Sequence, residues 1–166
     1  MANQVVLITG ASSGIGKSIG EFLAQKGYKV YGTSRNPKTT KANGIHFVAL
    51  DVTKVETITA AVEQIIAAEG KIDFLINNAG MGITGPIEEI PDAEIRKVFD
   101  TNYFGVINVI KAVLPFMRKQ GDGFIINITS IAGYMGLPYR GIYSATKGAL
   151  ELTTEAFRME LKEFNI

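Results

Sequence analysis

The feature that most constrains the fold is an alternation between short apolar runs and longer segments of helical periodicity. Five runs are largely apolar and bounded by turn residues: 5–9, 29–33, 46–50, 74–77 and 124–129. Helical periodicity marks four segments: 14–26, 54–68, 92–119 and 143–164. Strands without polar alternation are typical of a parallel sheet covered by helices on both faces. We therefore expect an α/β fold, a doubly wound parallel sheet in three αβα layers.

The 166 residues suffice for one domain with a sizeable core, and no repeat, low-complexity tract or linker divides them. Residues 36–44 are short and polar, so we expect a loop where such folds often place a helix. A doubly wound sheet normally continues with another strand after a helix such as 143–164. The sequence thus leaves two alternatives, a five-stranded domain or a fragment of a longer chain.

Composition excludes several classes of function. The net charge is +1 and no basic block occurs, so we expect no nucleic-acid partner. Without cysteine, the chain has no disulfides, iron–sulfur clusters, thiolate zinc sites or cysteine nucleophiles, and no other ligand cluster predicts a metal. Neither a signal peptide nor an apolar run of about 20 residues is present. We expect a soluble, cytoplasmic protein that does not enter a membrane.

The stretch TGASSGIGKS at residues 9–18 fits three functional motifs at once. Gly10, Gly14 and Gly16 match a dinucleotide-binding turn, and residues 11–18 match a loose phosphate-binding P-loop. Residues 10–14 also fit the G-x-S-x-G turn that presents a hydrolase serine. That serine needs a histidine base with an acid between the two in chain order. His46 is the only histidine and opens a strand, so we set the hydrolase aside.

The P-loop interpretation has real support in the first third of the chain. Lys17 and Ser18 stand where a P-loop places its lysine and hydroxyl, and Asp51 ends an apolar strand as a magnesium-binding aspartate does. Short glycine patterns arise often by chance, however. From these residues alone the dinucleotide interpretation is favoured while the P-loop NTPase stays open.

The second half of the chain carries a more specific set of residues. Ser130 follows a strand, and Tyr143 and Lys147 are four residues apart, one helical turn on one face. N-N-A-G occupies residues 77–80, and Asn102 lies within a helix. With T-G-x-x-x-G-x-G at residues 9–16, this set strongly resembles the short-chain dehydrogenase/reductase family, of its classical type. The resemblance covers essentially the whole chain.

The resemblance implies a single NAD(P)-binding domain of Rossmann type over residues 1–166. It further implies a hydride-transferring oxidoreductase in which Tyr143 is the acid/base, Ser130 positions the substrate oxygen, and Lys147 with Asn102 replenishes the proton. The cofactor contacts it implies are Gly10, Ser12, Ser13, Gly14, Ile15, Gly16, Ser34, Arg35, Asp51, Val52, Asn78, Ala79, Gly80, Tyr143 and Lys147.

Physical chemistry supports several of these roles. The glycines allow a tight turn and let a helix N-terminus approach the pyrophosphate. A phenol has a pKa of about 10, so proton exchange near neutral pH needs a cation beside it, and Lys147 is one turn away. Asn102 lies on an apolar helix stripe, where an unpaired amide is costly, so it must be hydrogen-bonded. The resemblance suggests that it holds a water leading to Lys147.

Cofactor preference follows from the end of the second strand. An NAD-specific site places a carboxylate there for the ribose hydroxyls, whereas this chain has Thr33, Ser34 and Arg35. A guanidinium favours a 2′-phosphate. We predict NADP(H), with NAD(H) the less favoured alternative.

The substrate side is apolar, with Met81, Ile83, Met135 and Leu137 among its expected residues, which suits a hydrophobic carbonyl compound or alcohol. Family members continue past this point with a substrate loop and further strands, so the resemblance implies a fragment that lacks them. It also implies a homodimer or homotetramer for the full-length form. A non-catalytic NADP-binding sensor or scaffold module is the alternative function.

Overall fold

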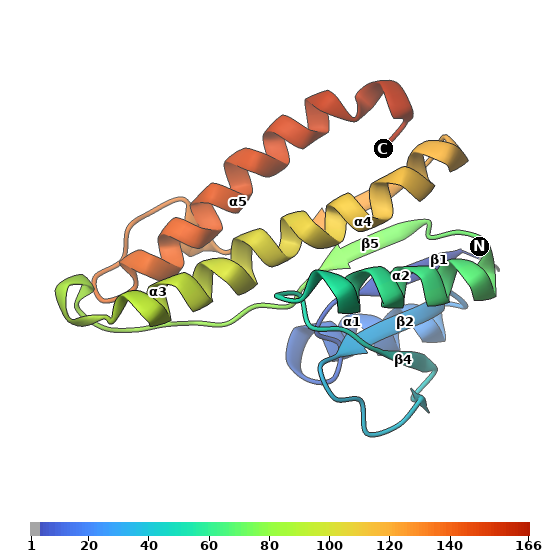
Figure 1. Ribbon diagram of the computed structural model, residues 1–166, viewed down its shortest axis with the longest axis horizontal. Coiled ribbons are helices and arrows are strands. Elements are labelled where there is room, and N and C mark those ends of the chain that lie inside the picture. The colour runs from blue at the N-terminus through green and yellow to red at the C-terminus, as the bar shows by residue number, and fades with distance from the viewer. Residues whose placement is uncertain (1–3) are drawn as a thin grey trace.

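The computed structural model describes residues 4–166, and it confirms the doubly wound α/β fold (Figure 1). The strands are β1 (Val5–Ile8), β2 (Lys29–Ser34), β3 (Lys41–Ala42), β4 (Ile45–Ala49), β5 (Phe74–Asn77) and β6 (Phe124–Asn127). The α-helices are α1 (Gly14–Gln25), α2 (Val55–Glu69), α3 (Asp92–Phe99), α4 (Gly105–Gln120) and α5 (Gly141–Glu160). Single turns are η1 (Ile87–Glu89), η2 (Asp100–Phe104), η3 (Ile131–Gly133) and η4 (Lys162–Phe164).

The strands form one sheet in the order β3-β4-β2-β1-β5-β6. All neighbours pair in parallel except β3, which runs antiparallel to β4 at the edge. The order reverses between β1 and β5, since β2 lies on one side of β1 and β5 on the other. Ligands of open α/β sheets bind at such a switch point, beyond the carboxyl ends of the strands.

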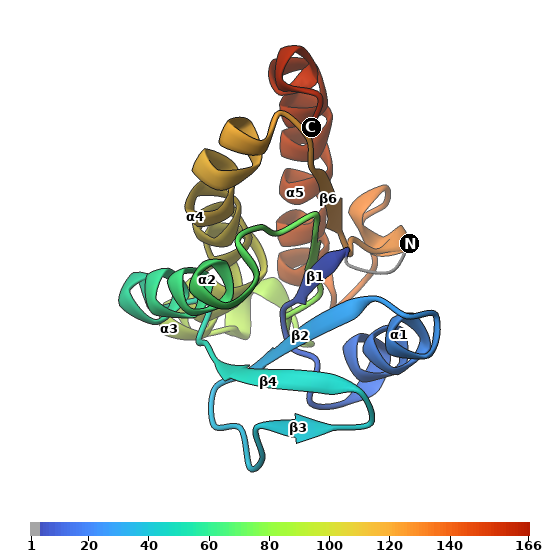
Figure 2. The ribbon, with the colours of Figure 1, turned by 90° about the vertical axis from the view of Figure 1, so that its right-hand side faces the viewer.

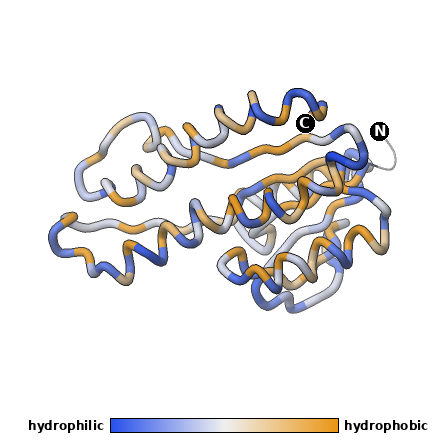
Figure 3. Tube along the Cα trace, turned by 45° about the horizontal axis from the view of Figure 1, so that its top comes forward, coloured by the Kyte–Doolittle hydropathy of each residue, from blue (hydrophilic) through white to orange (hydrophobic). Residues whose placement is uncertain are grey.

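Helices cover the two faces of the sheet unequally. Figure 2 shows α1 on one side of the strands, with α2 and α4 on the other. Side chains from β1, β2 and β4 pack with α1 in one core, and a larger core holds the inner sides of α2, α4 and α5. The alternating colours along the helices in Figure 3 reflect this burial of one side. No helix within residues 4–166 is long and apolar enough to cross a membrane.

The predicted loop at residues 36–44 contains a short strand that the sequence analysis missed. Asn43 and Gly44 have positive φ angles of 50° and 81°, and they join β3 to β4 in a tight hairpin. Asn-Gly is the dipeptide most suited to such a turn, because both residues adopt the left-handed region readily. The sheet therefore has six strands among the residues described, where the sequence predicted five.

The predicted helix over 92–119 is interrupted rather than continuous. Residues Asp100–Phe104 form a π turn, η2, between α3 and α4, and the Gly105 N–H donates to the Asp100 carbonyl across it. A π turn accommodates one more residue than an α turn and is frequent at functional sites. Here it holds Asn102 fully buried.

Candidate active site and cofactor cleft

The predicted site residues converge because they follow the carboxyl ends of parallel strands. The segment 10–16 follows β1, Ser34 and Arg35 lie at the end of β2, and 51–52 follow β4. Residues 78–80 follow β5, and Ser130 follows β6. Asn102 reaches this edge from η2, and Tyr143 and Lys147 from the first turns of α5.

The glycine turn is held by residues that follow β5. The Thr9 hydroxyl accepts the backbone N–H groups of Asn78 and Ala79, each at 3.0 Å. In return the Asn78 side-chain amide donates to the carbonyls of Thr9 and Gly10 at 3.0 and 3.1 Å. Gly10 has a φ of +68°, and a Cβ there would lie 3.0 Å from the Ala79 Cα. The turn after β1 and the segment after β5 are therefore one rigid unit.

Helix α1 presents an open N-terminus beside this unit. Ser13 precedes the helix in an extended conformation, and its side chain makes no capping hydrogen bond. Ser12, Ser13, Gly14 and Ile15 are exposed. The uncapped backbone N–H groups and the positive end of the helix dipole suit a phosphate. Lys17, which the P-loop interpretation requires, forms an ion pair with Glu21 of the same helix at 3.8 Å.

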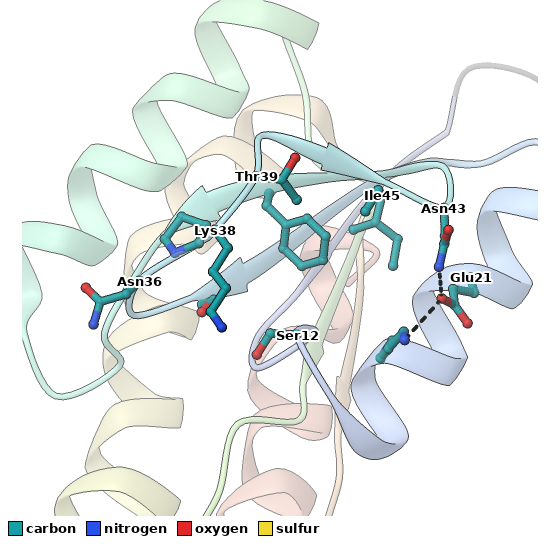
Figure 4. A pocket seen from close by; sticks show the side chains of 12 residues that line it. Ser12, Glu21, Asn36, Lys38, Thr39, Asn43 and Ile45 are labelled. Carbon is teal, nitrogen blue, oxygen red and sulfur yellow. Dashed lines mark hydrogen bonds and ion pairs between the residues drawn. The ribbon is translucent and has the colours of Figure 1, made fainter.

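Beside the end of β2, a cavity of about 460 Å³ opens between α1 and the 36–45 segment. Figure 4 shows Ser12 on one side of it and Lys38 and Asn36 on the other, with Ser34 also in the lining. The far end is closed by Glu21, which accepts a hydrogen bond from the Asn43 amide at 2.5 Å. The near end thus offers two hydroxyls and an ammonium, a donor set suited to a phosphate ester.

Arg35 and Asp51 face a second cavity of about 320 Å³. Partial burial raises the pKa of the Asp51 carboxyl, but two hydrogen bonds from Thr53 and the charges of Arg35 and Lys54 outweigh it, so the pKa lies below its ordinary value. Val52 is buried beside Gly105 at the start of α4. Asp51 is therefore an ionised acceptor at the rim of the cleft.

The buried amide of Asn102 is satisfied by the backbone and by α5. Its oxygen accepts the Met81 N–H at 2.8 Å, and its nitrogen donates to the Met81 carbonyl at 2.8 Å and to the Thr146 hydroxyl at 3.2 Å. Gly80 separates this amide from the Lys147 ammonium: a Cβ there would lie 3.3 Å from Asn102 Oδ1 and 3.8 Å from Lys147 Nζ. The expectation that Asn102 must be hydrogen-bonded is confirmed.

Lys147 and Ser130 are held by neighbouring backbone. Lys147 Nζ donates to the Ile128 carbonyl at 2.8 Å, and Ser130 Oγ accepts the Ala132 N–H at 3.2 Å. Tight packing of Gly133 on the backbone of Lys147 fixes η3 against α5. Tyr143 is half-buried, and its hydroxyl has no hydrogen-bond partner within residues 4–166, so no direct bond joins it to Ser130 or Lys147.

Burial of Lys147 makes stability depend on pH. Only 6% of the residue is exposed, and this burial lowers the pKa of its amine below the ordinary 10.5. The unfolded chain therefore binds this proton more tightly, and the unfolding free energy rises with pH between the lowered value and 10.5. At pH values below the lowered pKa, burial of the charged amine reduces the unfolding free energy by a constant amount.

We expect Lys147→Met to remove this rise. Urea denaturation of the cofactor-free protein, from neutral pH to about pH 10, measures the difference between wild type and variant. The wild type should gain stability relative to the variant as the pH increases. A difference that stays constant over this range would contradict the prediction.

The sequence analysis missed a partly buried polar network behind the site. The Asn77 amide donates to Asn127 Oδ1 at 2.9 Å, and the Asn127 amide donates to the Thr154 hydroxyl at 2.9 Å. This network ties the ends of β5 and β6 to α5, two turns beyond Lys147. The sequence did contain a signal for this network. Asn77 is the first residue of N-N-A-G, and Asn127 is a polar residue within the largely apolar run that precedes Ser130.

Comparisons with known proteins agree with this geometry. The family model described as short chain dehydrogenase matches residues 4–166. The chain is 49% identical over 166 residues to a 3-ketodihydrosphingosine reductase of Bacteroides thetaiotaomicron, and the match covers all of this chain and 61% of that protein. The chain thus spans about three fifths of the length of this curated relative.

Solved structures with different cofactors share the fold. A gluconate 5-dehydrogenase from Burkholderia cenocepacia, in complex with NADP and tartrate, has a TM-score of 0.94 and 30% identity, with all of this chain and 69% of that one covered. An NAD⁺-bound xylitol dehydrogenase has a TM-score of 0.95 and 32% identity, with 99% of this chain and 67% of that one covered.

Proposed function

The chain belongs to the short-chain dehydrogenase family, and from this premise we propose that it is an NADP(H)-dependent oxidoreductase that interconverts a carbonyl compound and an alcohol. The observation that carries the proposal is that the glycine turn lies at the same edge of the sheet as Asn102 and Lys147. Residues 78–80 connect the two: Asn78 bonds the turn, and Gly80 lies between Asn102 and Lys147. A bound dinucleotide and its reacting group would therefore lie against one continuous surface.

The residues present fit a nicotinamide dinucleotide. The turn at Gly10 and the open N-terminus of α1 would hold the pyrophosphate. Asp51 and Val52 would flank the adenine, and the absence of a side chain at Gly80 leaves room beside Lys147 for the ribose. When bound, NADPH supplies the hydride for carbonyl reduction.

We assign the proton chemistry to four side chains. Tyr143 gives its hydroxyl proton to the substrate oxygen, and Ser130 donates a hydrogen bond to the same oxygen while it accepts from Ala132. The ammonium of Lys147 favours the phenolate that remains, because opposite charges stabilise each other. The second lone pair of Asn102 Oδ1 is free to hold a water that passes protons toward Lys147.

NADP(H) is preferred over NAD(H) in this proposal, and the donors around the end of β2 support the preference. Ser12, Ser34 and Lys38 line one cavity, and Arg35 lies in the adjoining one. Each cavity also contains one carboxylate that already has partners: Glu21 accepts from Asn43, and Asp51 accepts from Thr53 and interacts with Arg35. These residues provide cations and hydroxyls for a 2′-phosphate.

We expect Arg35→Ala to weaken NADPH binding about tenfold while NADH binding stays within about twofold, since a hydrogen bond to a charged group contributes about 1.5–3 kcal/mol. Isothermal titration of the full-length protein with each cofactor gives the two affinities. Lys119→Ala, at the distant end of α4, removes an equal charge and serves as the control. Equal losses for NADPH and NADH would contradict a 2′-phosphate contact.

A hydrophobic substrate is the second part of the proposal. The segment after Ser130 exposes large apolar side chains beside the site: Ile131, Tyr134, Met135, Leu137 and Tyr139. The relative from Bacteroides is named a 3-ketodihydrosphingosine reductase, and its name supports a ketone as the substrate class. The test is NADPH oxidation by the full-length protein with ketones of increasing chain length. NADPH binding without oxidation of any ketone would instead indicate a sensor or scaffold module.

A homo-oligomer is the third part. Helix α5 exposes Leu152 and Met159 at 70% and 74%, and Phe104 beside the start of α4 is 52% exposed. Apolar side chains exposed on adjacent helices are typical of a subunit interface. We therefore assign α4 and α5 to contacts between copies of the full-length protein.

A further inference from the structure

Thr146 lies between the two catalytic residues of α5 but had no role in the sequence analysis. It is fully buried, with 0% of its surface exposed. Its hydroxyl donates to the Tyr143 carbonyl at 2.8 Å, one turn back along the helix. A threonine in a helix often makes this bond, which fixes its χ1 angle. With its proton committed to that carbonyl, the Thr146 oxygen can only accept from any other partner.

The partner is the amide of Asn102. Asn102 Nδ2 donates to Thr146 Oγ1 at 3.2 Å. The amide therefore makes one hydrogen bond to α5 in addition to its two hydrogen bonds to the Met81 backbone. Both amide hydrogens are then used, and the amide oxygen keeps one lone pair beyond the Met81 N–H. Because Thr146 accepts, it requires the nitrogen rather than the oxygen of Asn102 to face α5.

This orientation has a consequence for the proposed proton path. The oxygen of Asn102 lies on the side of Gly80, whose missing Cβ would be 3.3 Å from that oxygen and 3.8 Å from Lys147 Nζ. Three elements meet here: η2 provides Asn102, the segment after β5 provides Gly80 and Met81, and α5 provides Thr146 and Lys147. Thr146 is the side chain through which α5 binds the amide.

We propose that Thr146 is a positioning residue that holds the Asn102 amide and the Met81 backbone against α5. In this way it keeps the amide oxygen at its place beside Gly80 and near Lys147. The proposal rests on the function proposed above. It assigns Thr146 no contact with substrate or cofactor. Its effect should fall on turnover rather than on binding.

The test compares three variants of the full-length protein. Thr146→Val keeps the shape but removes both hydrogen bonds, and Thr146→Ser restores the hydroxyl. Thr153→Val is the matched control, because Thr153 also donates to a carbonyl one turn back, at 2.8 Å, and contacts η2 through the Tyr103 hydroxyl at 3.2 Å. A merely structural threonine at position 146 predicts similar results for the two valine variants.

We expect Thr146→Val to lower kcat for ketone reduction on the order of a hundredfold, as small misplacements in a positioned site do. KM for the ketone and Kd for NADPH should stay within about threefold. Thr146→Ser should recover kcat to within about threefold of wild type, and Thr153→Val should retain it. Equal losses in the two valine variants, or no recovery with serine, would overturn the proposal.

A second measurement does not depend on activity. Hydrogen exchange of the Met81 N–H in the cofactor-free protein reports its bond to Asn102 Oδ1. Thr146→Val should speed this exchange about tenfold relative to Thr153→Val. Unchanged exchange would overturn the proposal even in an active enzyme. If the wild type oxidises no NADPH, the proposed function fails while the exchange result still decides the role of Thr146.

Discussion

Tyr143→Phe should lower kcat for NADPH-dependent ketone reduction by about a thousandfold, within the range of about 10²–10⁴ that general acid–base catalysis contributes. Kd for NADPH should change less than about threefold. The variant loses one hydroxyl that has no hydrogen-bond partner within residues 4–166, so folding should be unaffected. The ring keeps its place beside the Arg140 guanidinium, 5.7 Å from the ring centroid. Steady-state kinetics and cofactor titration measure both quantities.

Tyr103→Phe is the control for this experiment. Tyr103 is a half-buried tyrosine of η2 whose hydroxyl bonds Thr153 on α5, away from the cleft. It loses a hydroxyl just as Tyr143→Phe does, but kcat should stay within about twofold of wild type. A Tyr143→Phe protein that loses NADPH affinity and thermal stability along with turnover would show that this tyrosine is structural.

Gly16→Ala should reduce NADPH affinity on the order of a hundredfold and destabilise the fold by about 1–3 kcal/mol. A Cβ at Gly16 would overlap the Asn78 amide and lie 2.5 Å from the Gly10 carbonyl oxygen. Asn78 holds the turn through its bonds to Thr9 and Gly10, so relief of the clash requires α1 to move away from the turn. The helix N-terminus would then lose its place at the pyrophosphate.

Gly14→Ala separates this packing effect from backbone strain. Gly14 has a φ of +55°, but nothing lies within 4 Å of a Cβ placed there. We therefore expect only the cost of a left-handed alanine, about 1–2 kcal/mol, and a smaller loss of NADPH affinity. Urea denaturation and titration of both variants provide the comparison. A Gly14→Ala protein impaired as strongly as Gly16→Ala would contradict the clash as the cause.

The sequence predicted the fold because its signals are local. Each strand is a short apolar run, and each helix has a clear buried side, so the alternation alone indicated the parallel sheet. The hairpin at Asn43 and Gly44 carried a local signal too, but β3 has only two residues and no apolar run. The π turn had no such signal. It depends on bonds between the Asn102 amide and Met81, which lies 21 residues earlier.

In the candidate site, too, features with a local sequence signal could be predicted and contacts between distant residues could not. A motif could indicate Asn102, Tyr143 and Lys147, because family resemblance assigns residue types at fixed spacing. It could not reveal Thr146 as the partner of Asn102, since that bond joins residues 44 apart in the chain. The bond between Asn77 and Asn127 spans 50 residues. The first pairing follows from the packing of η2 against α5 and the second from the register of β5 against β6, and periodicity specifies neither.

The π turn between α3 and α4 has a consequence for how such a chain can vary in length. Each residue of a helix turns the chain by about 100°. Deletion of one residue from Asp100–Phe104 would give a regular helix. It would also rotate α3 relative to α4 and break the hydrogen bonds of Asn102 to Met81 and Thr146. The exposed segment 36–44, which precedes β4, can gain or lose residues without such rotation. Natural relatives should therefore differ in length at this segment and keep the spacing between Asn102 and α4 unchanged.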